Sequence, residues 1–177
     1  MNRTGRDPTL CPSVRAKCAL RLALALGLAV AASEATAVTC TASTPGVAFG
    51  SYGVYATWNV NANGTLTISC SFGAGDSGNT PIAYTISLSA GASTSFIQRQ
   101  MKSGANALGY NLYTSNAYSV VWGDGTGSTS TVSGSMSVNP GHPTASNNHT
   151  VYGRIPALQD AAVATDYRDN VTVTVTY

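Results

Sequence analysis

The side chains best able to do chemistry in this chain are its cysteines and histidines. Cys40 and Cys70 lie about thirty residues apart, and such a pair could bind a metal ion or form a disulfide. No H-x-x-H pair or carboxylate cluster with ligand spacing accompanies them, so we expect no metal site. In an exported chain an even pair favours a disulfide, which is worth roughly 3–4 kcal/mol for a loop of this size. Two free, buried thiols are the alternative.

The histidines and serines do not assemble a recognisable catalytic site. His142 and His149 lie in or beside a stretch rich in Pro, Asn and Ser, where we expect solvated side chains. Serine is abundant, but no G-x-S-x-G elbow is present. We therefore expect neither an enzyme nor a cofactor, and a small secreted hydrolase is the least supported function that we consider.

The remaining motifs have simpler structural interpretations. "WGDGTGS" at 122–128 resembles part of a calcium loop but lacks the alternating acidic ligands, so a tight turn is the better interpretation. Glycosylation sequons begin at Asn63, Asn148 and Asn170, and such matches arise easily in a chain rich in Asn and Thr. A set of aromatic residues could line a sugar-binding face or fill a core with polar tips at its rim. These residues are Tyr52, Tyr55, Trp58, Tyr110, Tyr113, Tyr118 and Trp122.

The N-terminal segment has the features of a secretory signal peptide. A basic stretch precedes the apolar run "LALALGLAVAA" at 22–32, which is shorter than the ~20 residues that span a bilayer. Residues 35–37 fit an A-x-A cleavage site. We expect residues 1–37 to be removed and residues 38–177 to form a single domain. An earlier cut and a later start codon are alternatives.

Removal of this segment would change the charge balance of the chain. Five of the nine Lys and Arg residues lie in it, which leaves four basic and five acidic side chains and a net charge near −1. No basic patch remains for nucleic acid or anionic lipid, so we expect no nucleic-acid partner and no membrane span after cleavage.

The rest of the chain alternates apolar and polar residues over short runs, which is the pattern of half-buried strands. The pattern is clearest in "GTLTISCSF" at 64–72, "AYTISLSA" at 83–90 and "VTVTVTY" at 171–177. Weaker strands are expected at 47–52, 108–113, 120–122, 132–138 and 151–155. Turn-forming sequences separate them at 61–64, 73–81, 123–128 and 139–148, and only 156–164 could hold a helical turn.

Many short strands bounded by Gly, Asn or Pro predict an all-β fold, an antiparallel β-sandwich. Cys70 lies on the apolar face of its predicted strand. A bridge would therefore hold Cys40 against the core and join the first strand to the second.

Several runs, taken in order, resemble the spore coat protein U domain, the subunit domain of archaic (Csu-type) chaperone–usher pili. These runs are "FGSY" at 49–52, "GTLTISC" at 64–70, "YTISLSAG" at 84–91, "RQM" at 99–101, "LGYNLYTSNAYSVVWGDGT" at 108–126, "VYGRIPALQ" at 151–159 and "DYRDNVTVTVTY" at 166–177. Each run alone is weak, but the ordered set covers nearly the whole of residues 38–177.

The resemblance implies an immunoglobulin-like β-sandwich that lacks its own last strand. In such families a periplasmic chaperone supplies a strand during export, and an extension from a neighbouring subunit replaces it at the outer-membrane usher. By this analogy Val171, Val173, Val175 and Tyr177 border the groove for the missing strand, and basic chaperone residues hold the carboxylate of Tyr177. The implied route leads to the periplasm and then to the cell surface, in a pilus or coat.

The region before Cys40 departs from the family pattern. A repeating rod subunit needs a donor segment there, but cleavage after Ala37 would leave only Val38 and Thr39. We therefore expect an acceptor-type subunit, terminal or minor, or a coat protein that does not polymerise. A tip adhesin that binds sugars or surfaces is the main alternative, with the loops at 73–81 and 139–148 as its candidate contacts.

Overall fold

The computed structural model describes residues 38–73 and 78–177, and the predicted signal peptide lies outside these residues. The described residues belong to one compact unit. The one helical turn among them is the 3-10 helix η1 (Gly91–Ser93). Within this part of the chain, no helix combines the length and apolar character needed to cross a membrane.

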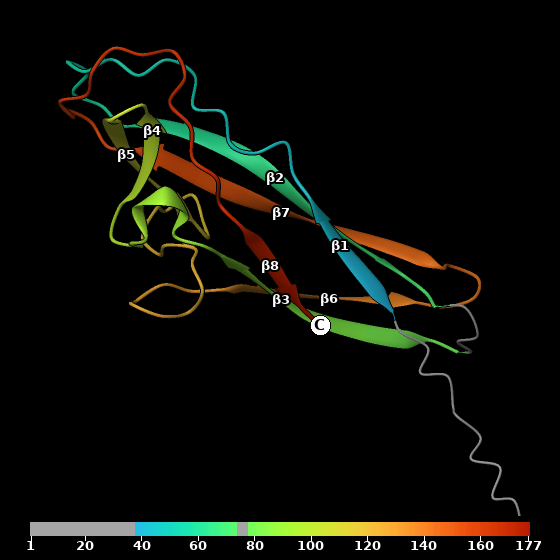
Figure 1. The fold of residues 1–177 in the computed structure, drawn as a ribbon. Helices are drawn as coiled ribbons and strands as arrows, with labels where there is room; N and C mark the ends of the chain where they lie inside the picture. The colour runs from blue at the N-terminus through green and yellow to red at the C-terminus, as the bar shows by residue number, and fades with distance from the viewer. Residues whose placement is uncertain (1–37, 74–77) are drawn as a thin grey trace, which may run out of the picture. The chain divides into compact units, whose positions relative to one another are not determined.

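The larger sheet contains five antiparallel strands in the order β1-β2-β7-β5-β4 (Figure 1). They are β1 (Thr39–Ser43), β2 (Val60–Ser71), β7 (Thr144–Ile155), β5 (Asn106–Tyr113) and β4 (Arg99–Ser103). The two longest strands, β2 and β7, pair along their whole length at the centre of the sheet.

The smaller sheet contains three antiparallel strands in the order β6-β3-β8 (Figure 1). They are β6 (Val132–Val138), β3 (Thr80–Leu88) and β8 (Val173–Thr176). β3 lies between the other two strands, so β6 and β8 are the edges of this sheet.

The core lies between the two sheets and consists of the inward-facing residues of both. In β2 and β3 every second side chain is buried, as the alternating pattern predicted. The most deeply buried apolar residues are Leu66, Ile68, Ile86, Trp122, Val138 and Ile155. The predicted all-β antiparallel sandwich is therefore confirmed.

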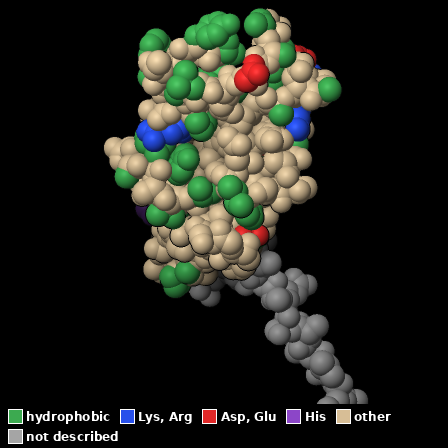
Figure 2. Space-filling view, turned by 90° about the vertical axis from the view of Figure 1, so that its left-hand side faces the viewer, with side chains coloured by type: hydrophobic (Ala, Val, Ile, Leu, Met, Phe, Trp, Pro, Cys, Tyr) green, Lys and Arg blue, Asp and Glu red, His purple; other side chains and the backbone are tan. Residues whose placement is uncertain are grey.

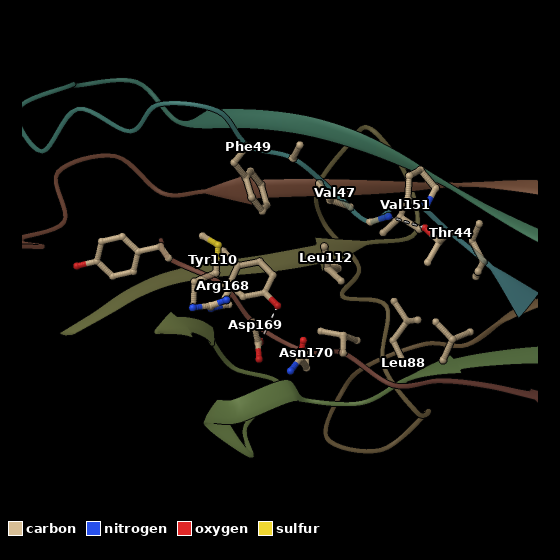
Figure 3. A pocket seen from close by; sticks show the side chains of 18 residues that line it. Thr44, Val47, Phe49, Leu88, Tyr110, Leu112, Val151, Arg168, Asp169 and Asn170 are labelled. Atoms are coloured by element: carbon tan, nitrogen blue, oxygen red, sulfur yellow. Dashed lines mark hydrogen bonds between the residues drawn. The ribbon is translucent and has the colours of Figure 1, made fainter. Parts of the chain in front are cut away.

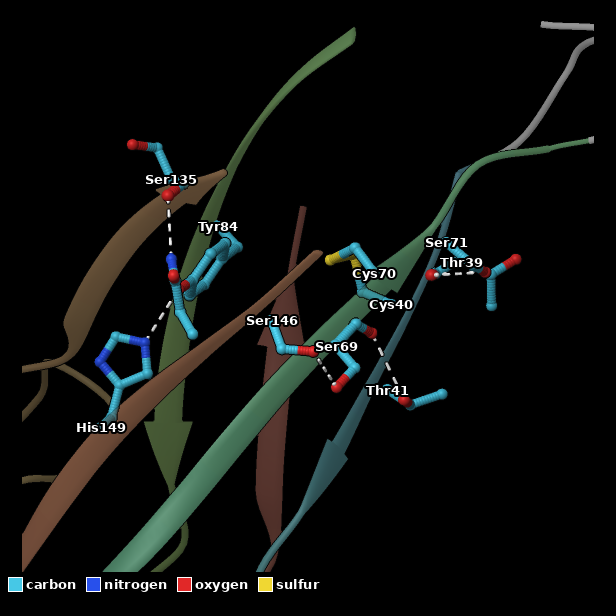
Figure 4. The surroundings of a disulfide bond; sticks show 11 residues. Thr39, Cys40, Thr41, Ser69, Cys70, Ser71, Tyr84, Ser135, Ser146 and His149 are labelled. Atoms are coloured by element: carbon cyan, nitrogen blue, oxygen red, sulfur yellow. Dashed lines mark hydrogen bonds between the residues drawn. A yellow bond between two sulfur atoms is a disulfide. The ribbon is translucent and has the colours of Figure 1, made fainter. Parts of the chain in front are cut away.

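The predicted disulfide is also confirmed, and it joins the first two strands. Cys40 and Cys70 face each other in the register of β1 and β2 and are bonded through their sulfur atoms (Figure 4). Hydroxyl side chains flank the bridge, including Ser69 and Ser146, whose oxygens lie 2.8 Å apart. The bridge thus holds edge strand β1 onto the sheet.

Some predicted elements are wrong. The turn expected at 61–64 lies inside β2, where pairing with β7 overrides the local Asn and Gly preferences. The segment 139–148 turns only at its start, because β7 already begins at Thr144. The strand expected at 120–122 consists of isolated bridges, and the one expected at 47–52 is irregular. No helical turn forms at 156–164.

Candidate functional site

The C-terminal segment passes from the larger sheet to the smaller one. At Arg168 it pairs with Lys102 of β4 through two backbone hydrogen bonds, of 2.8 and 3.1 Å. Four residues later the Ser89 N–H donates to the Thr172 carbonyl at 2.9 Å, beside the end of β3. The chain then continues as β8, with Thr176 opposite Thr85.

The outer side of β8 is an open edge within the described part of the chain. Backbone groups in an antiparallel ladder point alternately toward and away from the partner strand. Because Thr172 bonds to β3, the N–H and C=O groups of Val173 and Val175 point away from it. Such a row of backbone groups can pair with a further strand. Edge strand β1 of the larger sheet approaches β8 to within 8 Å between Cα atoms.

An apolar cavity of about 420 Å³ opens beside this edge (Figure 3). The larger sheet contributes Leu66, Met101, Leu112 and Val151, and β3 contributes Leu88. The segment 44–49 and the segment 167–173 form its rims. A cavity lined in this way can receive apolar side chains from an added strand.

The four residues predicted to border the groove lie in different surroundings. Val171 and Val173 line the cavity, and both are partly buried against the core. Val175 also packs partly on the core, but it does not line the cavity. The side chain of Tyr177 is 55% exposed. The structure thus brings the first two residues together at the cavity.

One rim of the cavity, the segment 44–49, is held by side-chain packing. Val47 and Phe49 lie over two glycines of the central strands, where a Cβ on Gly64 would meet Val47 at 2.8 Å and one on Gly153 would meet Phe49 at 2.7 Å. The Phe49 ring also packs edge-on against Tyr110, with 5.7 Å between centroids. A second cavity, of about 500 Å³, lies along the same segment.

The opposite rim carries a carboxylate, that of Asp169, whose side chain is among those that line the cavity (Figure 3). The Tyr110 hydroxyl donates to its Oδ2 at 2.7 Å, and the Ala92 N–H donates to its Oδ1 at 2.8 Å. Burial raises the pKa of Tyr110, and the hydrogen bond to Asp169 raises it further. Tyr110 is thus a donor to this carboxylate at any physiological pH.

Arg99 lies behind this rim and is fully buried. Its guanidinium donates to the carbonyl of Ser89 through Nε and Nη2, at 3.0 and 2.8 Å. It also donates to the Trp122 carbonyl at 2.8 Å and to Asn111 Oδ1 at 2.7 Å. Burial lowers the pKa of Arg99 from its ordinary value, but a guanidinium remains protonated in proteins. Arg99 thereby joins the end of β3 to β4 and β5.

The histidines differ from each other. His142 is exposed, as predicted, whereas the prediction for His149 is wrong: this side chain is half-buried between the sheets. Its Nε2 lies 2.9 Å from the Tyr84 hydroxyl, which also accepts a hydrogen bond from Asn147 (Figure 4). Burial lowers the pKa of His149. This trio links the two sheets away from the cavity.

The aromatic residues divide between core and surface. Trp122 and Tyr110 are buried, while Tyr55 and Trp58 are 92% and 69% exposed. Tyr118 packs edge-on between Tyr113 and Tyr152, under the Arg154 guanidinium at 3.7 Å from the ring centroid. The aromatic set therefore forms no single sugar-binding face.

Sequence reasoning found neither Asp169 at the cavity nor the buried Arg99 behind its rim. Arg99 lies on the same face of β4 as the buried Met101. The signal in the sequence was therefore a charged residue at a position where the strand pattern places an apolar one. Asp169 offered no such signal. Asp124, in contrast, forms the predicted turn, with its Oδ1 accepting from the Thr126 N–H at 2.9 Å. Within the described residues, no three His, Cys, Asp or Glu side chains group as metal ligands.

The fold and the open edge together define a class of protein, the two-sheet β-sandwich with an open edge strand. Within the described residues, this edge is the C-terminal strand β8 of the smaller sheet. The chain belongs to the Spore Coat Protein U domain family, whose model matches residues 26–174. No curated protein matches it.

Among solved structures, the chain is similar to one in a crystal structure from Acinetobacter baumannii. That structure is a chaperone–tip adhesion subunit pre-assembly complex of the archaic chaperone–usher Csu pili. The two chains are 25% identical with a TM-score of 0.48, and the match covers 80% of this chain. It covers 40% of the other chain, so this protein spans less than half the length of that neighbour.

Proposed function

We propose that this protein is an exported structural subunit of a cell-surface pilus or coat that accepts a strand from a partner at the open edge of β8. It is not an enzyme in this proposal. The partners would be a periplasmic chaperone, an outer-membrane usher and neighbouring subunits. The observation that carries the proposal is the backbone of Val173 and Val175, which has no partner strand among the described residues and lies beside an apolar cavity. Membership of the Spore Coat Protein U domain family supports it.

The physical basis is strand addition. A strand laid on β8 would pair with the outward N–H and C=O groups, and its alternate side chains would enter the cavity of about 420 Å³. Val47, Val171 and Val173 line this cavity and are only partly buried, so they offer apolar surface there. Burying one aliphatic side chain stabilises by about 1.5–3 kcal/mol, so two or three such anchors would contribute roughly 3–9 kcal/mol against the cost of ordering the added strand.

An appended strand tests the proposal without an identified partner. The turn Asn-Gly and eight residues alternating isoleucine and serine are added after Tyr177, so that the new strand can fold back antiparallel on β8. The control replaces each isoleucine with serine. We expect the isoleucine version to raise the melting temperature by about 5–10 °C, because 1 kcal/mol shifts a domain of this size by about 2–4 °C. Equal melting temperatures for the two versions would refute strand acceptance.

The proposal includes an acceptor-type role, as a terminal or minor subunit. It rests on the predicted cleavage after Ala37, which leaves two residues before Cys40 as a donor segment. The N-terminal residue of the exported protein, measured by intact mass and peptide mapping, tests this. A start at Val38 supports the acceptor role. A start that keeps part of the apolar run at 22–32 would instead fit a repeating subunit.

A tip adhesin is the second candidate, and exposed side chains in two loops favour it. Tyr55, Trp58, Leu158 and Val163 are each more than 65% exposed. The loops are tied together, because the Leu158 N–H donates to the Ala56 carbonyl at 3.2 Å. Figure 2 shows several hydrophobic side chains on the upper part of the face in view. The loops expected from the sequence carry none of the four exposed residues.

Adhesion of the purified domain to hydrophobic beads and to a glycan array separates the candidates. The variant Trp58→Ser with Val163→Ser should lose binding if these loops are adhesive. A matched control, Thr65→Ser, changes the exposed outer face of β2. If the purified domain binds no better than an unrelated β-sandwich domain, the adhesin function is excluded.

A further inference from the structure

The C-terminal strand has a repetitive sequence, and this raises the question of its register. Residues 171–176 read Val-Thr-Val-Thr-Val-Thr. A slip of one residue along β3 would expose the valines, but a slip of two would keep every valine inward and every threonine outward. The hydrophobic pattern therefore cannot distinguish registers that differ by two residues. Another interaction must select the observed one.

Asp169, just before the repeat, makes contacts that a slip would break. Its carboxylate accepts hydrogen bonds from the Tyr110 hydroxyl at 2.7 Å and from the Ala92 N–H at 2.8 Å. It packs so closely on Gly91 that a Cβ there would overlap Oδ2. A slip of two residues moves the chain by about 6.6 Å, which exceeds the reach of these hydrogen bonds.

The junction at Ser89 supports the same register. Its N–H donates to the Thr172 carbonyl, and its hydroxyl accepts from the Thr172 N–H, each at 2.9 Å. The Ser89 carbonyl is occupied by Arg99. A slipped strand could present Thr174 to Ser89 in place of Thr172, because both residues are threonine. The Asp169 contacts, in contrast, distinguish the two arrangements by residue type.

We propose that Asp169 is a positioning residue that fixes the register of β8 on β3 and thereby places Val171 and Val173 at the cavity. The inference rests on the proposed function in one respect: it makes Asp169 the residue that sets where an incoming strand must align. The open backbone groups of Val173 and Val175 then lie at a fixed distance from the apolar lining.

Disulfide trapping measures the register directly. Thr85 and Thr176 are opposite each other in the observed register, so a Thr85→Cys, Thr176→Cys pair traps it. A Ser87→Cys, Thr176→Cys pair traps a slip of two residues. Both pairs are introduced into otherwise native protein and into Asp169→Ala, and the crosslinks are quantified by peptide mass mapping under a glutathione buffer.

In the native background we expect the first pair to crosslink at least tenfold more than the second. In Asp169→Ala we expect this ratio to fall about tenfold, since a lost hydrogen bond to a charged group is worth about a tenfold change or more. The control Asn170→Ala changes the exposed side chain next to Asp169 and should leave the ratio unchanged. An unchanged ratio in Asp169→Ala, or an equal fall in Asn170→Ala, would overturn the inference.

Tyr110→Phe provides a second test if Asp169→Ala does not fold. It removes one hydrogen bond to the carboxylate and leaves the C-terminal sequence intact. The ratio should fall about threefold to tenfold, because the Ala92 bond remains. A purely structural role would lower the melting temperature without increasing the slipped crosslink. Failure of the appended strand to stabilise the native protein would refute strand acceptance alone, whereas a native register ratio in these variants would refute the role of Asp169 alone.

Discussion

Replacement of the buried Arg99 by methionine should strongly destabilise the domain. The change removes all four hydrogen bonds of the guanidinium. Asn111 Oδ1 keeps a donor in the Leu112 N–H at 3.2 Å, but the carbonyls of Ser89 and Trp122 lose theirs. Each buried acceptor without a donor costs about 1–3 kcal/mol, which gives about 2–6 kcal/mol.

Removal of the buried charge offsets part of this loss, because the guanidinium itself lost its hydration on folding. We therefore expect Arg99→Met to lower the free energy of unfolding by about 2–4 kcal/mol, a large part of the 5–15 kcal/mol typical of a domain. Arg99→Lys should have a free energy of unfolding between those of the native protein and Arg99→Met. The lysine ammonium keeps the charge but cannot reproduce the planar, forked hydrogen bonding of the guanidinium.

Urea denaturation followed by tryptophan fluorescence measures the effect. Trp122 is 1% exposed and reports on the core, so a Trp58→Phe background removes the signal of the exposed tryptophan. Lys102→Met is the matched control, because it removes a less buried cation from the same strand. The reasoning is refuted if Arg99→Met costs less than about 1 kcal/mol or no more than this control.

Three further outcomes follow from the structure. Cys40→Ser with Cys70→Ser should lower the free energy of unfolding by about 3–4 kcal/mol in urea melts, and no loss relative to the native protein would contradict the role of the bridge. Burial lowers the pKa of His149 in the folded protein, so the unfolded chain binds a proton more readily. The contribution of His149 to the free energy of unfolding should therefore be complete above about pH 6.5, the ordinary histidine pKa, and should be lost as the pH falls from there through the lower folded pKa. His149→Gln should remove this dependence, and an unchanged pH profile would show that other groups cause it. Gly153→Ala should cost about 1–3 kcal/mol, because its Cβ would meet Phe49 at 2.7 Å, and a neutral result would show that segment 44–49 moves freely.

The sequence predicted the strands whose apolar face is buried and whose pattern has period two. β2, β3 and β8 follow it because one face of each strand packs on the core. Asn63 and Gly64 indicated a turn, yet they lie within β2, since twelve residues of β7 pair beside them. Local preference was overridden there by a long-range partner that no local pattern shows.

The candidate site was predictable only in part. The alternation in 171–177 indicated a strand with an apolar face, and Val171 and Val173 do line the cavity. The contacts of Asp169 could not be predicted, because Tyr110 and Ala92 lie more than fifty residues earlier and meet it only in the folded chain. The second rim, at 44–49, depends on the fit of Val47 and Phe49 to two glycines that a linear sequence does not pair.

Amide hydrogen exchange of β8, measured residue by residue by NMR, tests strand acceptance most directly. In the lone domain we expect Thr174 and Thr176 to exchange slowly, since their N–H groups face β3, and Val173 and Val175 to exchange fast at the open edge. Adding the isoleucine–serine strand should slow Val173 and Val175 by about a hundredfold or more, equal to about 2.7 kcal/mol of protection. Slow exchange of both valines in the lone domain, or no change on strand addition, would contradict the account.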